Sequence, residues 1–273
     1  MPYPSRPQGT IQYRNVGRVV LVTGGCSGIG RAICEAFANS GATVVCADVD
    51  DVAARSLPTE ITFVRCDTSS KDDCTAAVAF TIERFAGLDV LVNNAAVQPK
   101  ESYVPIDELP TDVWQRLIGI NFSGYTFMAQ PALRHMKQQR SGVVVNIASG
   151  QAHRTARGVG AYGPIKAANL LQARQWAVEY ARDGIRVVSV SPGAIDTPLV
   201  RASLEEQGGG AAIANRHPIG RIGTPAEVAC AVLWLCSSDA SFVTGTDLEV
   251  DGGLGAFGAF ADPFDEDTSV PPG

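Results

Sequence analysis

Short runs of apolar, often β-branched residues recur along the chain, separated by longer stretches in which apolar residues are spaced three or four apart. The runs are apolar almost throughout, which is typical of strands buried on both faces of a sheet. The longer stretches have the periodicity of helices. We expect strands at 18–22, 43–47, 61–66, 88–92, 143–147, 186–190 and 247–250, and helices at 31–39, 71–85, 111–137, 162–182 and 225–236.

This alternation of strands and helices predicts an α/β fold with a parallel sheet covered on both sides. No linker-like change in composition interrupts residues 17–260, so we expect a single domain there. Residues 1–16 form a proline-bearing N-terminal extension, and the acidic segment 261–273 is expected to be a flexible tail because it has little to bury.

Composition and charge exclude several classes of partner. The 273 residues are 45% hydrophobic and carry a net charge of -6, and we find no basic stripe that would bind nucleic acid. The N-terminal segment lacks the apolar core of a signal peptide, and the apolar runs are too short to span a membrane. Seven cysteines without a CxxC pair, and three histidines without metal-site spacing, predict a cytoplasmic protein with reduced thiols and no metal.

A glycine-rich turn, Thr-Gly-Gly-Cys-Ser-Gly-Ile-Gly over residues 23–30, follows the first predicted strand and precedes a predicted helix. Gly24 allows a tight turn, Gly28 lets the backbone approach a pyrophosphate, and Gly30 permits close contact between helix and strand. The helix start favours phosphates through its unpaired N–H groups. The order of elements therefore predicts a dinucleotide site, although the GxxxGxG spacing is not the commonest one.

Two other interpretations of this turn, a P-loop and a hydrolase nucleophile elbow, are excluded by the sequence. A P-loop would end in Gly-Lys-Ser/Thr, and a hydrolase elbow around Ser27 would need glycine where Ile29 stands. Cys26 lies beside the helix start, where its thiol pKa would be lowered and its reactivity raised; the alternative is an inert turn residue.

Asp48 ends the second predicted strand, twenty residues after Gly28. A carboxylate at this place accepts hydrogen bonds from the adenosine ribose and repels a 2′-phosphate. Ser27 supplies no positive charge for such a phosphate, and Arg31 lies beyond the turn. The balance favours NAD over NADP.

Tyr162 and Lys166 are four residues apart in a predicted helix, so both side chains project from one face. A nearby ammonium favours the phenolate, although YxxxK alone is common by chance. Ser149, after the strand that ends at residue 147, could hold a reacting oxygen at the carboxyl edge of the sheet. Asn121 could hold a water that links Lys166 to solvent.

The joint pattern resembles the short-chain dehydrogenase/reductase family, and the resemblance extends from about residue 17 to 253. It implies a doubly wound (Rossmann) sheet of seven parallel strands in the order 3-2-1-4-5-6-7 and a catalytic tetrad of Asn121, Ser149, Tyr162 and Lys166. It also implies cofactor contacts from Gly24, Ser27, Gly28, Ile29, Gly30, Asp48, Cys66, Asp67, Thr68, Asn93, Ala95, Tyr162, Lys166, Pro192, Gly193, Ile195 and Thr197.

The implied activity is hydride transfer between a secondary alcohol or ketone and NAD(H). The four-residue separation of Tyr162 and Lys166 counts against a reductase of carbon–carbon double bonds. Two departures from the family pattern leave the tetrad intact: Ala96 stands where glycine is usual, and Pro164 is expected in the first turn of its helix. The resemblance also implies a homotetramer formed through the two long helices.

The substrate is less closely defined. We expect a lid at about 199–217. Gln98, Gln151 and His153 are candidate substrate contacts, and Arg154 or Arg157 could meet a carboxylate. These residues favour a small polar substrate such as a sugar, polyol or hydroxy acid. Alternatives are a hydrophobic alcohol such as a steroid, or a non-catalytic protein that senses NAD.

Overall fold

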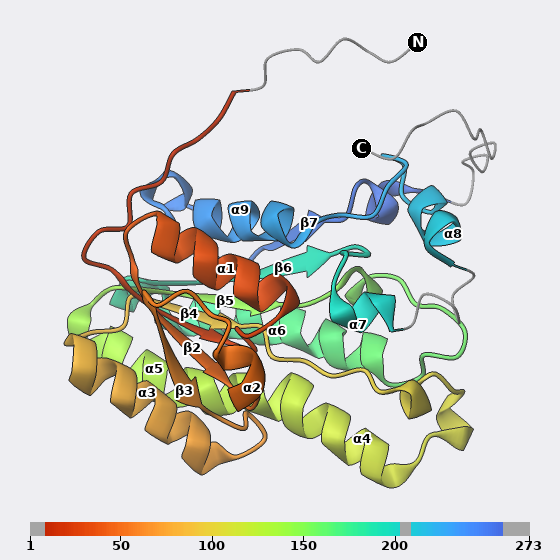
Figure 1. The fold of residues 1–273 in the computed structure, drawn as a ribbon, viewed down its shortest axis with the longest axis horizontal. Coiled ribbons are helices and arrows are strands. Elements are labelled where there is room, and N and C mark those ends of the chain that lie inside the picture. Colours follow the sequence, from red (N-terminus) through yellow and green to blue (C-terminus); the bar gives the residue numbers. More distant parts are fainter. Residues whose placement is uncertain (1–8, 203–208, 259–273) are drawn as a thin grey trace.

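The computed structural model describes residues 9–202 and 209–258. Seven parallel strands form one sheet in the order β3-β2-β1-β4-β5-β6-β7, which confirms the predicted topology (Figure 1). Their bounds are β1 Val19–Thr23, β2 Thr43–Asp48, β3 Ile61–Arg65, β4 Val90–Asn93, β5 Gly142–Ile147, β6 Ile185–Pro192 and β7 Asp247–Val250.

Helices cover both faces of this sheet because apolar side chains leave each strand alternately on its two sides. Val20 and Val22 share a core with α1 and α9, whereas Leu21 packs with α3, α5 and α6 on the other face (Figure 1). The α-helices are α1 Gly28–Asn39, α2 Asp51–Ala54, α3 Lys71–Phe85, α4 Thr111–Ile118, α5 Gly124–Gln139, α6 Tyr162–Tyr180, α7 Pro198–Arg201, α8 Gly209–Asn215 and α9 Pro225–Cys236.

The prediction of one continuous helix at 111–137 is wrong in one respect. It divides into α4 and α5, with a π-helical turn at Gly119–Ser123 between them. Such a turn inserts an extra residue and is frequent at functional sites. Here it contains Asn121, whose side chain is completely buried. Apolar periodicity across the segment did not reveal this interruption.

One helix boundary and one short helix also differ from the sequence prediction. Helix α1 begins at Gly28 rather than residue 31, so the glycine-rich turn supplies its first residues. The four-residue helix α2 was not predicted because it is too short to have a periodicity. The Asp50 side chain stabilises its start by accepting hydrogen bonds from the backbone N–H groups of Val52 and Ala53.

The predicted N-terminal extension contacts the domain at Asn15, which is buried and bonded to Ser40 through its backbone and side chain. The predicted tail, 261–273, lies outside the described residues. Within the described part of the chain, no helix combines the length and apolarity that a membrane span needs.

Candidate active site

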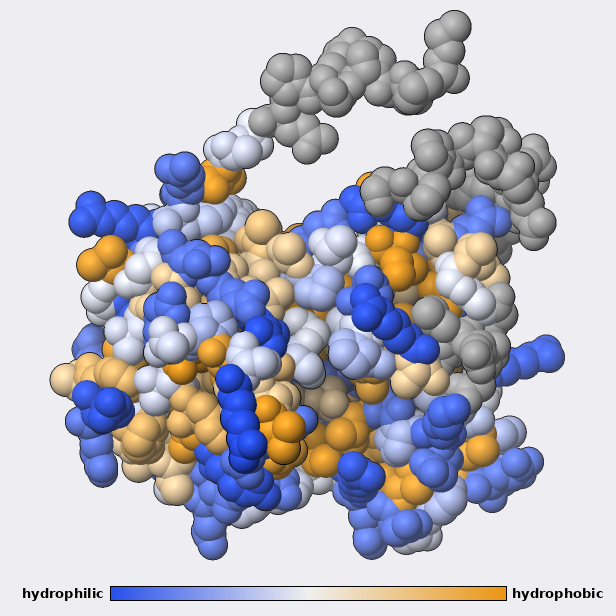
Figure 2. Space-filling view, in the orientation of Figure 1, coloured by the Kyte–Doolittle hydropathy of each residue, from blue (hydrophilic) through white to orange (hydrophobic). Residues whose placement is uncertain are grey.

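A cavity of about 590 Å³ lies at the carboxyl ends of the strands, where open α/β sheets bind their ligands. The face drawn in Figure 2 carries mixed hydrophilic and apolar side chains and is hollowed near its centre. Most of the predicted cofactor residues line this cavity: Gly24, Ser27, Gly28, Ile29, Asp48, Cys66, Asp67, Thr68, Ala95, Tyr162, Lys166, Pro192, Gly193, Ile195 and Thr197.

The glycine-rich turn has the geometry that its sequence predicts. Gly24 and Gly28 have positive φ angles of 64° and 52°, which favour glycine. A Cβ atom on Gly30 would lie 2.1 Å from the Gly24 carbonyl oxygen, so only glycine fits there. Asn94 holds the turn from behind, because its Nδ2 donates to the carbonyls of Thr23 and Gly24 at 2.9 and 3.1 Å.

Asp48 is fixed at the end of β2 by two backbone hydrogen bonds. Its Oδ2 accepts from the Cys26 N–H at 2.9 Å and its Oδ1 from the Asp50 N–H at 3.1 Å. Arg31 is directed elsewhere, since its guanidinium binds Glu35 and Ser56. The cavity wall at this point therefore carries a negative charge.

The reactive-thiol interpretation of Cys26 is wrong. The side chain is 3% exposed, and its Sγ lies 3.6 Å from the Sγ of Cys46. Burial, together with the neighbouring Cys46 and Asp48, raises the pKa of the Cys26 thiol. Although Cys26 lies beside a helix start, its side chain packs into the core, so the helix does not make the thiol reactive.

Two predicted cofactor residues are not among those that line the cavity. Gly30 is buried and packs against the Gly24 carbonyl. Asn93 is completely buried, and its Nδ2 donates to Asn146 Oδ1 at 3.0 Å and to the Tyr125 carbonyl at 3.3 Å. Asn93 therefore ties β4 to β5 and α5 behind the cavity wall.

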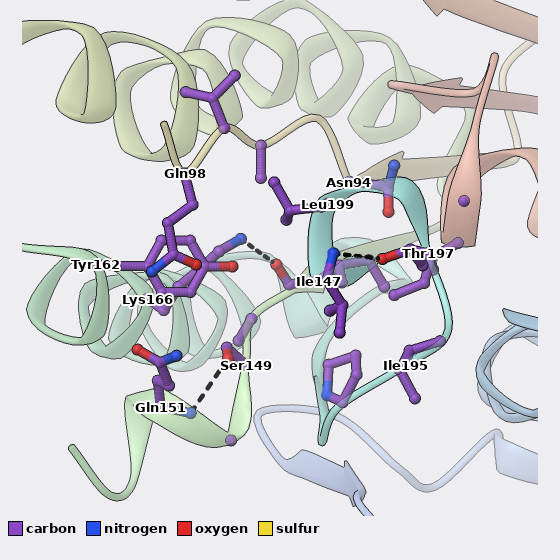
Figure 3. Close-up of a pocket in the computed structure, with 18 of the residues that line it drawn as sticks. Asn94, Gln98, Ile147, Ser149, Gln151, Tyr162, Lys166, Ile195, Thr197 and Leu199 are labelled. Carbon is purple, nitrogen blue, oxygen red and sulfur yellow. Dashed lines mark hydrogen bonds between the residues drawn. The ribbon is translucent and has the colours of Figure 1, made fainter. Parts of the chain in front are cut away.

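Ser149 and Tyr162 lie together at the cavity, one from the end of β5 and one from the first turn of α6 (Figure 3). Ser149 Oγ accepts a hydrogen bond from the Gln151 N–H at 3.1 Å. Burial and the neighbouring Tyr103 raise the pKa of Tyr162, and a hydrogen bond with Ser149 acts in the opposite direction. A phenolate on Tyr162 therefore needs positive charge close by.

Lys166 is the nearby cation, with its side chain inside the protein and its ammonium 5.7 Å from the centre of the Tyr162 ring. The Nζ atom donates to the Ile147 carbonyl at 2.8 Å (Figure 3) and to the Tyr125 hydroxyl at 3.1 Å. Burial lowers the pKa of Lys166 to about 7. The role of Tyr125 in this cluster was not predicted.

Asn121 is held by contacts that its sequence motif did not reveal. Its side-chain amide donates to the Val97 carbonyl and accepts from the Val97 N–H, both at 2.8 Å. Its own carbonyl accepts from Asn169 Nδ2 at 2.9 Å. The side chain thus fixes the loop after β4, and its predicted link through water to Lys166 stays a prediction.

Of the three candidate substrate residues, two line the cavity and one does not. Gln98 and Gln151 line the cavity (Figure 3). His153 is not among the lining residues: its Nε2 lies 2.7 Å from Asp247 Oδ2 and 3.5 Å from Ser191 Oγ. Its ring therefore contacts β7 and β6 and does not contribute to the cavity wall.

His217 is a site residue that the sequence did not indicate. It is buried, its Nδ1 donates to the Ile213 carbonyl at 2.8 Å, and its Nε2 accepts from the Ala194 N–H at 3.1 Å. These bonds join α8 to the segment between Gly193 and Ile195. Residues 203–208 of the predicted lid lie outside the described residues.

Known proteins resemble the chain over most of its length. Residues 24–255 match the family model described as Enoyl-(Acyl carrier protein) reductase. The cis-4-hydroxycyclohexanecarboxylate dehydrogenase of Sinomonas cyclohexanicum is 41% identical over 88% of this chain and 97% of its own length.

Two solved structures from Brucella melitensis share the fold. The first, titled short-chain dehydrogenase/reductase SDR:Glucose/ribitol dehydrogenase, is 35% identical with a TM-score of 0.81 and covers 89% of this chain and 99% of its own. The chain belongs to the short-chain dehydrogenase/reductase family. The second, a 3-ketoacyl-(acyl-carrier-protein) reductase complexed with NADH, is 31% identical with a TM-score of 0.82, over 88% of this chain and 99% of its own.

As a member of this family the chain is an oxidoreductase that acts on CH–OH groups and uses a nicotinamide cofactor. The site fits a dinucleotide, because one cavity extends from the side-chain-free turn at Gly24 and Gly28 to Tyr162. Pro164 lies in the first turn of α6, as predicted. The family model carries the name of a double-bond reductase, whereas the three proteins named above are dehydrogenases or a ketoacyl reductase.

Proposed function

We propose that this enzyme is an NAD-dependent dehydrogenase of small polar secondary alcohols. The observation that carries the proposal is the joint position of Ser149, Tyr162 and Lys166 at one end of a cavity whose other end is the glycine-rich turn. A protein that only sensed NAD would have no need of this hydroxyl, phenol and ammonium group together.

The preference for NAD rests on the charge of Asp48. Its carboxylate is oriented by the N–H groups of Cys26 and Asp50 at the cavity wall. Such a group accepts hydrogen bonds from a ribose diol and repels a 2′-phosphate. The guanidinium of Arg31 is engaged by Glu35 and Ser56, so it does not offset this charge.

NAD, when bound, supplies the hydride acceptor. In alcohol oxidation the Tyr162 phenolate removes the hydroxyl proton, and the Ser149 hydroxyl donates a hydrogen bond to the oxygen as it becomes a carbonyl. The Lys166 ammonium lines the same cavity and stabilises the phenolate by its positive charge. Asn121 fixes the loop that carries Gln98, and by family resemblance it supports proton exit.

Substrate polarity is supported by the side chains around the tetrad. Gln98 and Gln151 bring amides to the cavity, and the matched relatives named above include enzymes of ring-bearing or sugar substrates. Apolar side chains such as Val97, Leu199 and Ile213 line the cavity as well, so the two amides determine where a polar group of the substrate can bind.

We also propose that the enzyme is a cytoplasmic homotetramer. All seven cysteines are free thiols, in agreement with a reducing compartment. Leu171 and Val178 on α6 are 65% and 81% exposed, which suits a helix that packs against another subunit. Light scattering coupled to size exclusion measures the assembly directly.

The function is tested by following NADH formation with a panel of secondary alcohols that includes polyols, hydroxy acids, steroids and fatty alcohols. Tyr162→Phe keeps the ring and removes the acid–base group, so turnover should fall by about 10²–10⁴-fold while NADH binding persists. Retention of more than about a tenth of wild-type turnover would falsify the role of Tyr162. A clear preference for steroids or fatty alcohols would refute the polar substrate.

A further inference from the structure

Two amide side chains beside the catalytic tyrosine have polar atoms without partners. Gln98 Nε2 and Gln151 Oε1 are buried and have no hydrogen-bond partner among the described residues. In Figure 3 both side chains come toward Tyr162, one from the loop after β4 and one from the 3₁₀ turn at Gly150–Ala152. Because buried polar atoms are nearly always paired in native proteins, this donor and this acceptor are expected to meet a ligand.

The backbone of each glutamine is fixed by a residue of the tetrad. The Gln151 N–H donates to Ser149 Oγ at 3.1 Å. Gln98 follows Val97, whose N–H and carbonyl are both bonded to the Asn121 side chain at 2.8 Å. The backbone from which each amide side chain extends is therefore held in place by Ser149 or Asn121, so both amides are carried on fixed segments beside the reacting centre.

The unpaired atoms distinguish between kinds of polar substrate. A hydroxyl group both donates and accepts, so hydroxyls can satisfy Gln98 Nε2 and Gln151 Oε1 together. A carboxylate only accepts and would leave Gln151 Oε1 buried and unpaired. Arg154, one of two arginines in the segment after Ser149, lines the cavity and donates through Nη1 to the Phe257 carbonyl, so part of its hydrogen-bonding capacity is already used.

We propose that Gln98 and Gln151 bind the hydroxyl groups that the substrate carries next to its reacting alcohol, so that the substrates are neutral cyclic diols, polyols or sugars rather than hydroxy acids. This inference rests on the proposed dehydrogenase function and narrows its substrate class. The pair acts on specificity, because it contacts the substrate away from the carbon that loses hydride.

The test compares kcat/KM for a vicinal cyclohexanediol, cyclohexanol and hydroxycyclohexanecarboxylate in the wild type, Gln98→Leu and Gln151→Leu. Each leucine removes hydrogen bonds and keeps side-chain volume, so the diol-to-cyclohexanol ratio should fall roughly three- to tenfold in each variant. Gln12→Leu, an exposed position outside the cavity, is the matched control. Calorimetry of the diol with the enzyme–NADH complex should show the same loss in affinity.

The outcomes separate this inference from the proposed function. If cyclohexanol or the carboxylate is used as well as the diol, or if the variants leave the ratio unchanged, the hydroxyl site is wrong and the dehydrogenase function stands. If no alcohol of any class reduces NAD, both proposals fail.

A separate observation concerns the buried hydroxyl of Tyr125. It donates to the Ile147 carbonyl at 2.8 Å and accepts from Lys166 Nζ at 3.1 Å, while Nζ also donates to the Ile147 carbonyl at 2.8 Å. The three groups form a closed triangle at the cavity end of β5. An ammonium has three hydrogens, so these bonds leave one for the cavity that Lys166 lines.

We infer that Tyr125 is a positioning residue that holds the Lys166 ammonium in this orientation. It lies one helical turn after Asn121, at the start of α5, and is 1% exposed. Its hydroxyl also stabilises the charged form of the lysine by accepting a hydrogen bond. The titratable groups that act on this cluster are Tyr103, Tyr125, Tyr162 and Lys166.

The test is Tyr125→Phe, with Tyr125→Met as a second variant and Tyr180→Phe, on the far end of α6, as control. Loss of the acceptor lowers the pKa of Lys166 and weakens its support of the Tyr162 phenolate. The pH of half-maximal alcohol oxidation should therefore rise by about one unit. A purely structural role would lower Tm in both variants and leave both pH profiles unchanged, and that result would overturn the inference.

Discussion

Lys166→Met should make the free protein more stable while it abolishes dehydrogenase activity. The lysine is 1% exposed and sits between the Ile147 carbonyl and the Tyr125 hydroxyl. Burying its charge costs free energy, whereas methionine has a similar length and no charge. The catalytic group is thus expected to reduce the free energy of unfolding of the protein that contains it.

The size of this effect follows from the pKa of Lys166, which burial lowers from 10.5 to about 7. That difference corresponds to about 5 kcal/mol. The unfolded chain binds a proton up to a higher pH than the folded one, so the cost is complete below about pH 7. It disappears as pH rises toward 10.5, the ordinary pKa of the unfolded lysine.

The assay is urea unfolding of the wild type and Lys166→Met, without cofactor, at about pH 6 and about pH 9. The stability difference in favour of the methionine variant should shrink by about 2–3 kcal/mol between the two values. Effects of the substitution that do not depend on pH, such as the change in packing, are the same at both pH values. They therefore cancel when the two stability differences are compared. A difference that stays constant with pH would show that Lys166 is not buried as a costly charge.

Three further predictions concern other parts of the molecule. Asp48→Ala should narrow the kcat/KM preference for NAD over NADP by about tenfold or more, since like charges placed together cost several kcal/mol. Asp48→Asn keeps a hydrogen-bond acceptor without the charge, so it separates the two contributions. A wild-type enzyme that prefers NADP would refute the assignment. Thr224→Ala should lower the free energy of unfolding by about 1 kcal/mol, because Thr224 and Glu227 form a reciprocal capping box at the start of α9. Chemical denaturation measures this free energy, and an unchanged value would mean that the cap is not formed. Iodoacetamide should label the exposed Cys230 and spare the buried Cys26 with or without NAD, as peptide mapping can show, and rapid labelling of Cys26 would contradict its raised pKa.

The sequence by itself determined those features that depend on neighbours close along the chain. Apolar runs indicated the strands and their buried character, the glycine spacing indicated the turn from Gly24 to Gly30, and a four-residue interval placed Tyr162 and Lys166 on one helix face. Local backbone geometry fixes each of these features, so residue type and spacing are enough to predict them. The seven-strand order came from the family resemblance, and the structure confirms it.

Tertiary structure alone decided where side chains at these positions point. Asn121 bonds Val97, 24 residues away in sequence, Lys166 meets Tyr125 across 41 residues, and His153 turns to Asp247 across 94. No local pattern encodes such contacts, because each needs two elements to be brought together by the packing of the sheet and its helices. For the same reason, Cys26 could not be recognised as a core residue until β2 placed Cys46 behind it.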